Sequence, residues 1–123
     1  MANFFYGKYH VSAPEERTRD GVIFSSKAEM RRYLELKLME KAGKIRGLTL
    51  QPKFLLFPSF YRKGVFHHSL NYIGDFLYYD MEKKRKVVED VKGVETEVFK
   101  IKYKLFCFRH NMELRIVKTS EIR

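Results

Sequence analysis

Two aspartates and a lysine in the middle of the sequence have the residue types and spacing of a metal site. Asp75 lies within the apolar stretch YIGDFLYYD, where a carboxylate has little reason to be unless it is paired or bound to a metal. Asp90 and Lys92 lie in VVEDVKG, and alternation along a strand puts them on one face and Glu89 on the other. We expect Glu89 to pair with basic side chains, unless a bulge exchanges the faces of Glu89 and Asp90. Two neighbouring carboxylates suit Mg²⁺ or Mn²⁺, and the lysine can then polarise water or stabilise charge on a phosphate. The alternative is that the aspartates pair with some of the many lysines of the chain.

The carboxylates can meet only if the strands that carry them are neighbours, and the surrounding sequence predicts that they are. Residues 69–80 and 87–93 are rich in β-forming side chains, and the charged turn MEKKRK between them predicts an antiparallel hairpin. Residues 48–57 alternate apolar side chains and predict a preceding strand, with Pro52 at the sheet edge or at a strand start. Residues 113–118 predict a short final strand.

Two helices are predicted around these strands. Residues 24–43 contain Ser26 and Glu29 in the spacing of a capping box and are rich in Leu, Met, Glu and Lys. Residues 96–110 return to helical spacing. The element order is therefore α-β-β-β-α-β. The apolar residues that give the second helix its spacing are Val98, Ile101, Leu105 and Phe108.

The composition indicates one basic domain. The chain has 123 residues, which predicts an N-terminal arm of residues 1–20 followed by a single domain of residues 21–123. Lys and Arg number 25 against 15 Asp and Glu, a net charge of +10 that favours nucleic acid over a membrane as partner. Cys107 is the only cysteine, which excludes an internal disulfide and a multi-cysteine zinc site. We expect no signal peptide and no membrane span, and therefore a protein of the reducing cytoplasm.

The pattern of Asp75, fourteen intervening residues, and then Asp90-x-Lys92 resembles the active site of the PD-(D/E)XK nuclease superfamily. Position 74 departs from the pattern, because it is glycine where the superfamily name implies proline. Within residues 20–117 the chain further resembles a phage-associated family of small proteins of unknown function that are grouped with Holliday-junction-resolvase-like nucleases. The resemblance implies a single restriction-endonuclease-like α/β domain with a mixed central sheet, in which the motif occupies the middle hairpin. The stretches that carry it are GVIFSSKAEMRRYLELKLMEKAGKIRGLTLQPKF, YIGDFLYYD, VVEDVKG and TEVFKIKYKLF, in that order.

The resemblance implies a role for each matching position. Asp75 and Asp90 would be the metal ligands, with the backbone carbonyl of Val91 as a third, and Lys92 would be the catalytic lysine. Glu29 matches an acidic residue that many relatives direct at the metal, although its capping role needs no active site. The implied cofactor is Mg²⁺, for which Mn²⁺ can substitute.

Several further residues are candidates for DNA contact. Residues 58–68 predict a basic and aromatic loop, whose composition suits phosphates and exposed bases; the alternative is a loop without a binding role. Gln51 either positions a water or phosphate or hydrogen-bonds a strand edge. Lys100 and Lys104 share one face of the second helix, which is either a solvated face or a phosphate contact. The candidates are Gln51, Arg62, Lys63, Lys100 and Lys104.

These observations lead us to expect a metal-dependent endonuclease that hydrolyses phosphodiester bonds in DNA by in-line attack of water. The resemblance implies that the cut leaves a 5′-phosphate. The resemblance implies branched or Holliday-junction DNA as substrate, in phage or prophage replication and recombination, in the host cytoplasm if the chain is phage-encoded. A homodimer is expected because symmetric cutting of a four-way junction needs two active sites. The alternatives are a nuclease of the same chemistry that acts on flaps, ends, nicks or RNA, and a non-catalytic DNA-binding protein on a nuclease fold.

Overall fold

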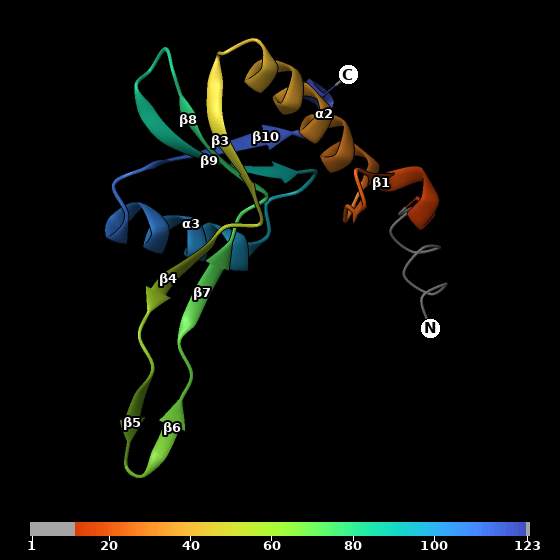
Figure 1. Ribbon diagram of the computed structural model, residues 1–123. Helices are drawn as coiled ribbons and strands as arrows, with labels where there is room; N and C mark the ends of the chain where they lie inside the picture. The colour runs from red at the N-terminus through yellow and green to blue at the C-terminus, as the bar shows by residue number, and fades with distance from the viewer. Residues whose placement is uncertain (1–11, 123) are drawn as a thin grey trace.

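A four-stranded mixed sheet forms the centre of the protein, as seen in a computed structural model that describes residues 12–122 (Figure 1). Its strand order is β10-β9-β8-β3. Strands β3, β8 and β9 are antiparallel neighbours, which confirms the predicted hairpin of the second and third strands, and β10 runs parallel to β9. The strands comprise Ile45–Leu50 (β3), Phe76–Asp80 (β8), Arg85–Lys92 (β9) and Glu113–Lys118 (β10).

Two helices cover the two faces of this sheet. Helix α2, Lys27–Lys41, begins after Ser26, whose hydroxyl accepts a 3.0 Å hydrogen bond from the Glu29 N–H. Helix α3, Glu97–Arg109, begins after Thr96, whose hydroxyl accepts one of 3.1 Å from the Phe99 N–H. Along the chain the two helices and the four strands of the central sheet follow in the order α2-β3-β8-β9-α3-β10, which confirms the predicted α/β class and the predicted α-β-β-β-α-β core order. No helix within residues 12–122 combines the length and the apolar character that crossing a membrane requires.

Each face of the sheet has its own hydrophobic core. Neighbouring residues of β9 point to opposite faces, so Val87 packs in the core under α2 and Val88 in the core under α3. The core under α2 contains Phe24, Met30, Tyr33, Leu36, Ile45, Phe76, Tyr78 and Val87. The core under α3 contains Leu56, Tyr72, Val88, Phe99, Phe106 and Leu114.

The buried face of α3 differs from the one that the apolar spacing indicated. Phe99 and Phe106 are buried, whereas Val98, Ile101 and Phe108 are exposed. Apolar side chains occur around most of this helix, so their spacing alone does not select the side that meets the sheet.

The strands predicted at residues 48–57 and 69–80 are each divided by a bend. The first bends at Gln51, whose φ is +50°, and at Pro52, and the second bends after β7 at Gly74. A left-handed residue followed by proline cannot continue a regular strand, so pairing with the central sheet stops there. The apolar alternation continues through the bend, which is why the sequence predicted one long strand on each side.

The outer parts of these segments form a ribbon that projects from the sheet (Figure 1). Strand β4 pairs with β7, and beyond them β5 pairs with β6 in a hairpin where we had predicted a loop. Lys63 and Gly64 in its turn both have positive φ, as a two-residue type I′ turn requires. We refer to residues 53–73 as the ribbon. Its strands comprise Lys53–Phe57 (β4), Phe60–Arg62 (β5), Val65–His67 (β6) and Leu70–Ile73 (β7).

The described part of the predicted N-terminal arm is held against α2 by strand pairing and a hydrogen bond. Strand β1 pairs with β2 across the predicted boundary at residue 20, and the Tyr33 hydroxyl of α2 donates a 2.7 Å hydrogen bond to Asp20. Residues 1–11 of the arm, and residue 123, lie outside the described residues. The remaining elements are Pro14–Arg17 (η1), Thr18–Arg19 (β1), Val22–Ile23 (β2) and Thr119–Glu121 (η2).

Candidate active site

Asp75 lies at the bend between β7 and β8, where neighbouring segments fix its backbone. Its N–H donates to the Glu89 carbonyl at 2.9 Å, and its carbonyl accepts from the Gln51 N–H at 3.0 Å. Its carboxylate accepts a 2.6 Å hydrogen bond at Oδ2 from the Val91 N–H. These contacts direct the Asp75 side chain at the end of β9. Because the N–H and C=O of a strand residue point toward the same neighbour, the Val91 carbonyl faces the Asp75 side as well.

Gly74 lets the backbone approach β9 closely just before Asp75. A Cβ at this position would lie 2.7 Å from Cγ1 of the buried Val88, and the Gly74 N–H donates to the Pro52 carbonyl at 2.9 Å. A proline at position 74 would place side-chain atoms against Val88 and would remove this N–H. The two contacts give a physical reason for glycine at this position.

Asp90 and Lys92 lie on the same face of β9, above the α3 core. The Tyr72 hydroxyl donates to Oδ2 of the buried Asp90, and Lys92 Nζ lies 3.4 Å from Oδ1. Burial and the Asp90 carboxylate raise the pKa of Tyr72 well above its usual range, so the phenol stays a hydrogen-bond donor. The Lys92 ammonium also sits 4.4 Å from the centroid of the Phe99 ring, within range of a cation–π contact. Asp90 and Lys92 are thus held in place from two sides.

Glu29 joins the aspartates from the first turn of α2. Its side chain is 4% exposed, and its carboxylate accepts a hydrogen bond from the Ser25 hydroxyl while its N–H is capped by Ser26. Burial raises the pKa of Glu29, Ser25 opposes this shift, the Asp90 charge adds to it, and a hydrogen bond involving Asp75 lowers it. The capping contact and the proximity to the aspartates therefore coexist.

The carboxylates of Glu29, Asp75 and Asp90 are largely buried and repel one another. Burial and then the Glu29 charge raise the pKa of Asp75 from 3.8 to about 7; the Val91 N–H and Lys92 oppose this shift, and Asp90 adds to it. When the carboxylates are ionised, the Lys92 ammonium interacts favourably with Asp90 and Asp75. A further positive charge would stabilise their ionised forms.

The donor set fits a hard divalent cation. Mg²⁺ prefers oxygen ligands and often takes only one or two carboxylates, with water and substrate phosphates completing its coordination. Asp75, Asp90 and the Val91 carbonyl supply such oxygens, with Glu29 beside them. Within residues 12–122 no group of three or more His, Cys, Asp or Glu side chains is arranged so that it could hold a metal ion. Two carboxylates and a carbonyl nevertheless match the sparse protein coordination of Mg²⁺.

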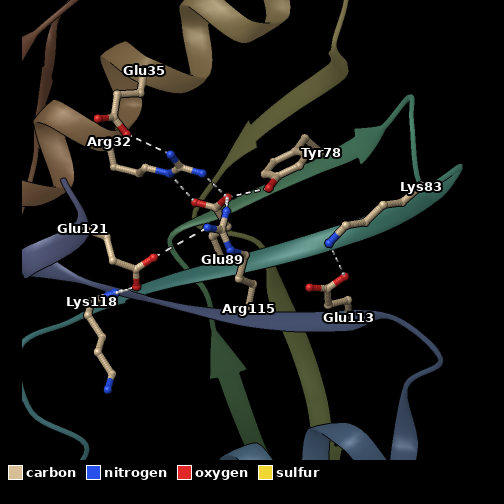
Figure 2. A network of polar contacts seen from close by, with 9 residues as sticks. All are labelled: Arg32, Glu35, Tyr78, Lys83, Glu89, Glu113, Arg115, Lys118 and Glu121. Atoms are coloured by element: carbon tan, nitrogen blue, oxygen red, sulfur yellow. Dashed lines mark hydrogen bonds and ion pairs between the residues drawn. The ribbon is translucent and has the colours of Figure 1, made fainter. Parts of the chain in front are cut away.

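Glu89 points to the opposite face of β9 and is held in a buried ionic network, which Figure 2 shows. It is fully buried, and its two carboxylate oxygens accept 2.7 Å hydrogen bonds from Nε and Nη2 of Arg32 on α2. Oε2 also accepts from the Tyr78 hydroxyl at 2.5 Å and lies 3.4 Å from Arg115 on β10. Glu89 therefore pairs with basic side chains, as expected, and its network fixes the strand phase that directs Asp90 to the other face.

A cavity of about 530 Å³ opens beside Asp90, between the base of the ribbon and the start of α3. It brings together three lysines, Lys53, Lys92 and Lys102, which come from three different elements. Polar and apolar groups complete its wall: Asn71, Tyr72, Ile73, Thr96, Val98 and Phe99. The cavity thus places cationic side chains next to the carboxylate cluster.

Comparison with known protein families gives one match. Residues 8–122 match the model of a family described as "Protein of unknown function (DUF1064)". The chain belongs to this family. No curated protein and no solved structure matches the chain in the corresponding comparisons.

The predicted DNA-contact residues of this DUF1064 protein do not lie together. Lys100 and Lys104 line a separate hollow with Glu97, and Lys100 Nζ lies 3.2 Å from the Glu97 carboxylate. Gln51 lies at the bend and supports Asp75 through its N–H. Arg62 and Lys63 stand near the tip of the ribbon, at the β5–β6 turn.

Sequence analysis missed three polar residues of the cavity and the tyrosine that supports Asp90. Lys53 and Asn71 reach the site because the ribbon bends at its base, and the alternation pattern did not reveal this bend. Lys102 follows Thr96 and Phe99 at steps of three residues, so helical spacing from the cap could have identified it. Tyr72 carried no signal beyond its place in an apolar strand.

Proposed function

We propose that this protein is a metal-dependent DNA endonuclease that hydrolyses phosphodiester bonds. The observation that carries the proposal is that Asp75 interacts electrostatically with Asp90 and Glu29, and that Asp90 lines a cavity together with three lysines. The acids suit a divalent cation and the lysines suit phosphates, so the site combines the two requirements of phosphodiester hydrolysis. The resemblance to PD-(D/E)XK nucleases supports the same chemistry.

Each residue has a role in this proposal. Asp75, Asp90 and the Val91 carbonyl would hold Mg²⁺, or Mn²⁺ in its place, with Glu29 close by. When bound, the ion supplies positive charge that stabilises the scissile phosphate and makes water more acidic. Lys92 beside Asp90 orients the attacking water and stabilises the charge that develops on phosphorus oxygens.

The reaction itself is a displacement at phosphorus. The oxygen of water forms a bond to phosphorus, the bond to the 3′-oxygen breaks, and the products are a 5′-phosphate and a 3′-hydroxyl. Lys53 and Lys102 bind phosphates beside the cut and hold the strand in the cavity. Tyr72 keeps the Asp90 carboxylate oriented during this step.

The substrate and setting follow from the resemblance and from the charge of +10. We propose branched DNA, in particular four-way junctions, as substrate, in phage or prophage replication and recombination within a reducing cytoplasm. Two active sites on a homodimer would cut opposite strands of one junction.

The test is incubation of the purified protein with labelled four-way junction, flap, nicked and linear duplex DNA in Mg²⁺, Mn²⁺ or EDTA. Asp90→Asn and Lys92→Ala remove the proposed ligand and catalytic lysine. Glu82→Gln and Lys86→Ala are matched controls, because both are exposed and lie at the opposite end of the β8–β9 hairpin. Calorimetric titration with Mg²⁺ gives a second readout that does not depend on activity.

We expect metal-dependent cutting of the junction that both site variants lose and both controls keep. Cutting of flaps or nicks alone would keep the active site and change the substrate. Binding of DNA without cutting under every metal, together with no heat of Mg²⁺ binding, would refute the proposal in favour of a DNA-binding protein on this fold.

A further inference from the structure

The ribbon exposes large apolar side chains that belong to neither core. Tyr61 is 73% exposed, Phe57 51%, and Phe60 and Phe66 are more than two-fifths exposed. Exposed aromatic groups of this number on one projecting element mark an interaction surface. The question is which partner such a surface fits.

The charge of the ribbon favours a polyanion. The sequence contains no aspartate or glutamate between Glu40 and Asp75, the longest interval of the chain without an acidic residue. The ribbon carries Lys53 at its base and Arg62 and Lys63 near its tip. An acid-free segment with cations at both ends is complementary to a phosphate backbone.

The aromatic rings lie on both faces of the ribbon. On one face the Phe60 and His67 rings stack at 4.7 Å and 7° across the β5–β6 pair, with the Phe57 ring 5.9 Å from Phe60. On the other face Tyr61 and Phe66 lie 5.0 Å apart. Rings of this kind offer flat surfaces on which a base can stack, a contact that every base can make.

The ribbon begins at the cavity and extends away from it. Lys53 and Asn71 at its base line the cavity that contains Asp90. Residues 53 to 62 form two successive strands, which at roughly 3.3 Å per residue extend over at most about 30 Å. A nucleic-acid strand whose phosphate lies in the cavity can therefore follow the ribbon over several nucleotides.

We propose that the ribbon binds unpaired nucleotides of the substrate strand next to the cleavage site. Bases stack on the exposed rings of Tyr61 and Phe66, while Arg62 and Lys63 contact the phosphates. The ribbon thereby selects DNA that has a single-stranded or splayed segment. This inference rests on the proposed function only for the position of the cut; binding itself can be measured without cleavage.

The test is fluorescence anisotropy in EDTA with three labelled probes: a single strand, a duplex with a single-stranded flap, and a blunt duplex. The first variant, Tyr61→Ala/Phe66→Ala, removes rings that lie outside both cores. Val65→Ala is the matched control, since it removes exposed apolar surface from the same hairpin but no ring. A second variant replaces residues 58–69 with Asn-Gly, which joins Phe57 to Leu70, a cross-strand pair in the present register.

We expect the ring variant to bind the single strand and the flap at least about tenfold more weakly, a loss that corresponds to the stacking of one base. Its affinity for blunt duplex should change less than about threefold, and Val65→Ala should bind every probe as the wild type does. The variant without residues 58–69 should show the same selective loss.

Three results would overturn the inference. Equal loss on all probes, or no loss, would mean that the rings do not bind unpaired bases. If the shortened variant instead turned from dimer to monomer in sedimentation and kept its DNA affinity, the ribbon would bind a second copy of the chain. Selective binding by the ribbon without any cleavage would refute the proposed function alone, and cleavage with unchanged probe binding in both variants would refute this inference alone.

Discussion

At the scale of single residues, the bend at positions 74 and 75 leaves no room for a side chain at position 74. Gly74 lies against the stiff, buried side chain of Val88, and Asp75 follows at once with its carboxylate directed at β9. The position of one carboxylate thus depends on the missing side chain of its neighbour.

Gly74→Ala should destabilise the protein by about 1–3 kcal/mol, because the new methyl group would overpack the core at Val88. Chemical denaturation measures this free energy of unfolding. Gly93→Ala is the control, since a Cβ there meets no atom within 4 Å and its φ is not left-handed. Equal effects of the two substitutions would show that Val88 moves aside.

The raised pKa of Asp75 should make the metal-free protein less stable as the pH rises. Its pKa is 3.8 ordinarily and about 7 in the folded protein, so the folded state holds a proton that the unfolded chain releases between these values. This contribution to stability is complete below pH 3.8 and is lost as the pH rises through about 7. Asp75→Asn removes the titration.

Melting temperatures measured in EDTA between about pH 4 and pH 8 test whether stability falls as the pH rises. We expect the melting temperature of Asp75→Asn to exceed that of the wild type by an amount that grows with pH. A difference that stays constant, or that shrinks, would contradict the assigned burial and repulsion of Asp75.

At the scale of elements, the ionic network around Glu89 joins α2 to the sheet. Arg32 of α2 binds both oxygens of Glu89, and Arg115 of β10 approaches the same group from the neighbouring strand (Figure 2). Because Glu89 and Asp90 are adjacent on β9, the network that holds Glu89 on one face also fixes the orientation of Asp90, a candidate ligand, on the other face. The α2 side of the sheet, to which β9 contributes no candidate ligand, therefore also helps to position the candidate site.

Arg32→Leu should cost about 3–5 kcal/mol of folding free energy, because Glu89 would remain buried with its main partner gone. The double variant Arg32→Leu/Glu89→Met should recover part of this loss, since no uncompensated charge remains. Lys83→Leu breaks an exposed pair with Glu113 and should cost less than about 1 kcal/mol. Urea unfolding measures the free energy of unfolding of the three variants. A small loss for Arg32→Leu would mean that Arg115 alone compensates the buried charge of Glu89.

The two sides of α3 should differ in their effect on DNA. Lys102 faces the cavity, whereas Lys100 lies in another hollow with Glu97. Lys102→Ala should weaken binding and lower the slope of log affinity against log salt by roughly one, and Lys100→Ala should leave the slope nearly unchanged. Salt titrations of DNA binding measure both. The reverse order of effects would place the DNA on the outer side of α3.

At the scale of the whole molecule, the protein combines a small α/β domain with a projecting ribbon. One copy has one carboxylate cluster among its described residues, and a four-way junction requires two cuts. Sedimentation should therefore show a dimer, or dimer formation on addition of junction DNA. A protein that stays monomeric at all concentrations, with and without junction, would favour flaps or nicks as substrate.

The sequence was sufficient for features that depend on local rules. Asp75, Asp90 and Lys92 could be placed together because a hairpin and the alternation of its side chains follow from neighbouring residues. The order of helices and strands followed from caps and periodicity in the same way.

The features that the sequence did not reveal depend on packing between distant segments. Which side of α3 meets the sheet is decided by contacts of Phe99 and Phe106 with both strands and ribbon, not by the helix alone. The inclusion of Lys102 in the cavity and the exposure of Phe108 both follow from that one rotation. The bend at Gln51 likewise depends on the Asp75 carbonyl that its N–H binds.

The ribbon leaves the domain after β3 and returns at β8, two strands that are neighbours in the sheet. The chain therefore enters and leaves the ribbon at neighbouring positions of the sheet. A change in the number of residues between Phe57 and Leu70 would leave the packing of the sheet unchanged. Members of the family should accordingly differ in the length of the segment between Phe57 and Leu70. Insertions and deletions of two residues in a strand are expected, because they keep each side chain on its own face of the ribbon. The interval between Asp75 and Asp90 should stay constant among the same members.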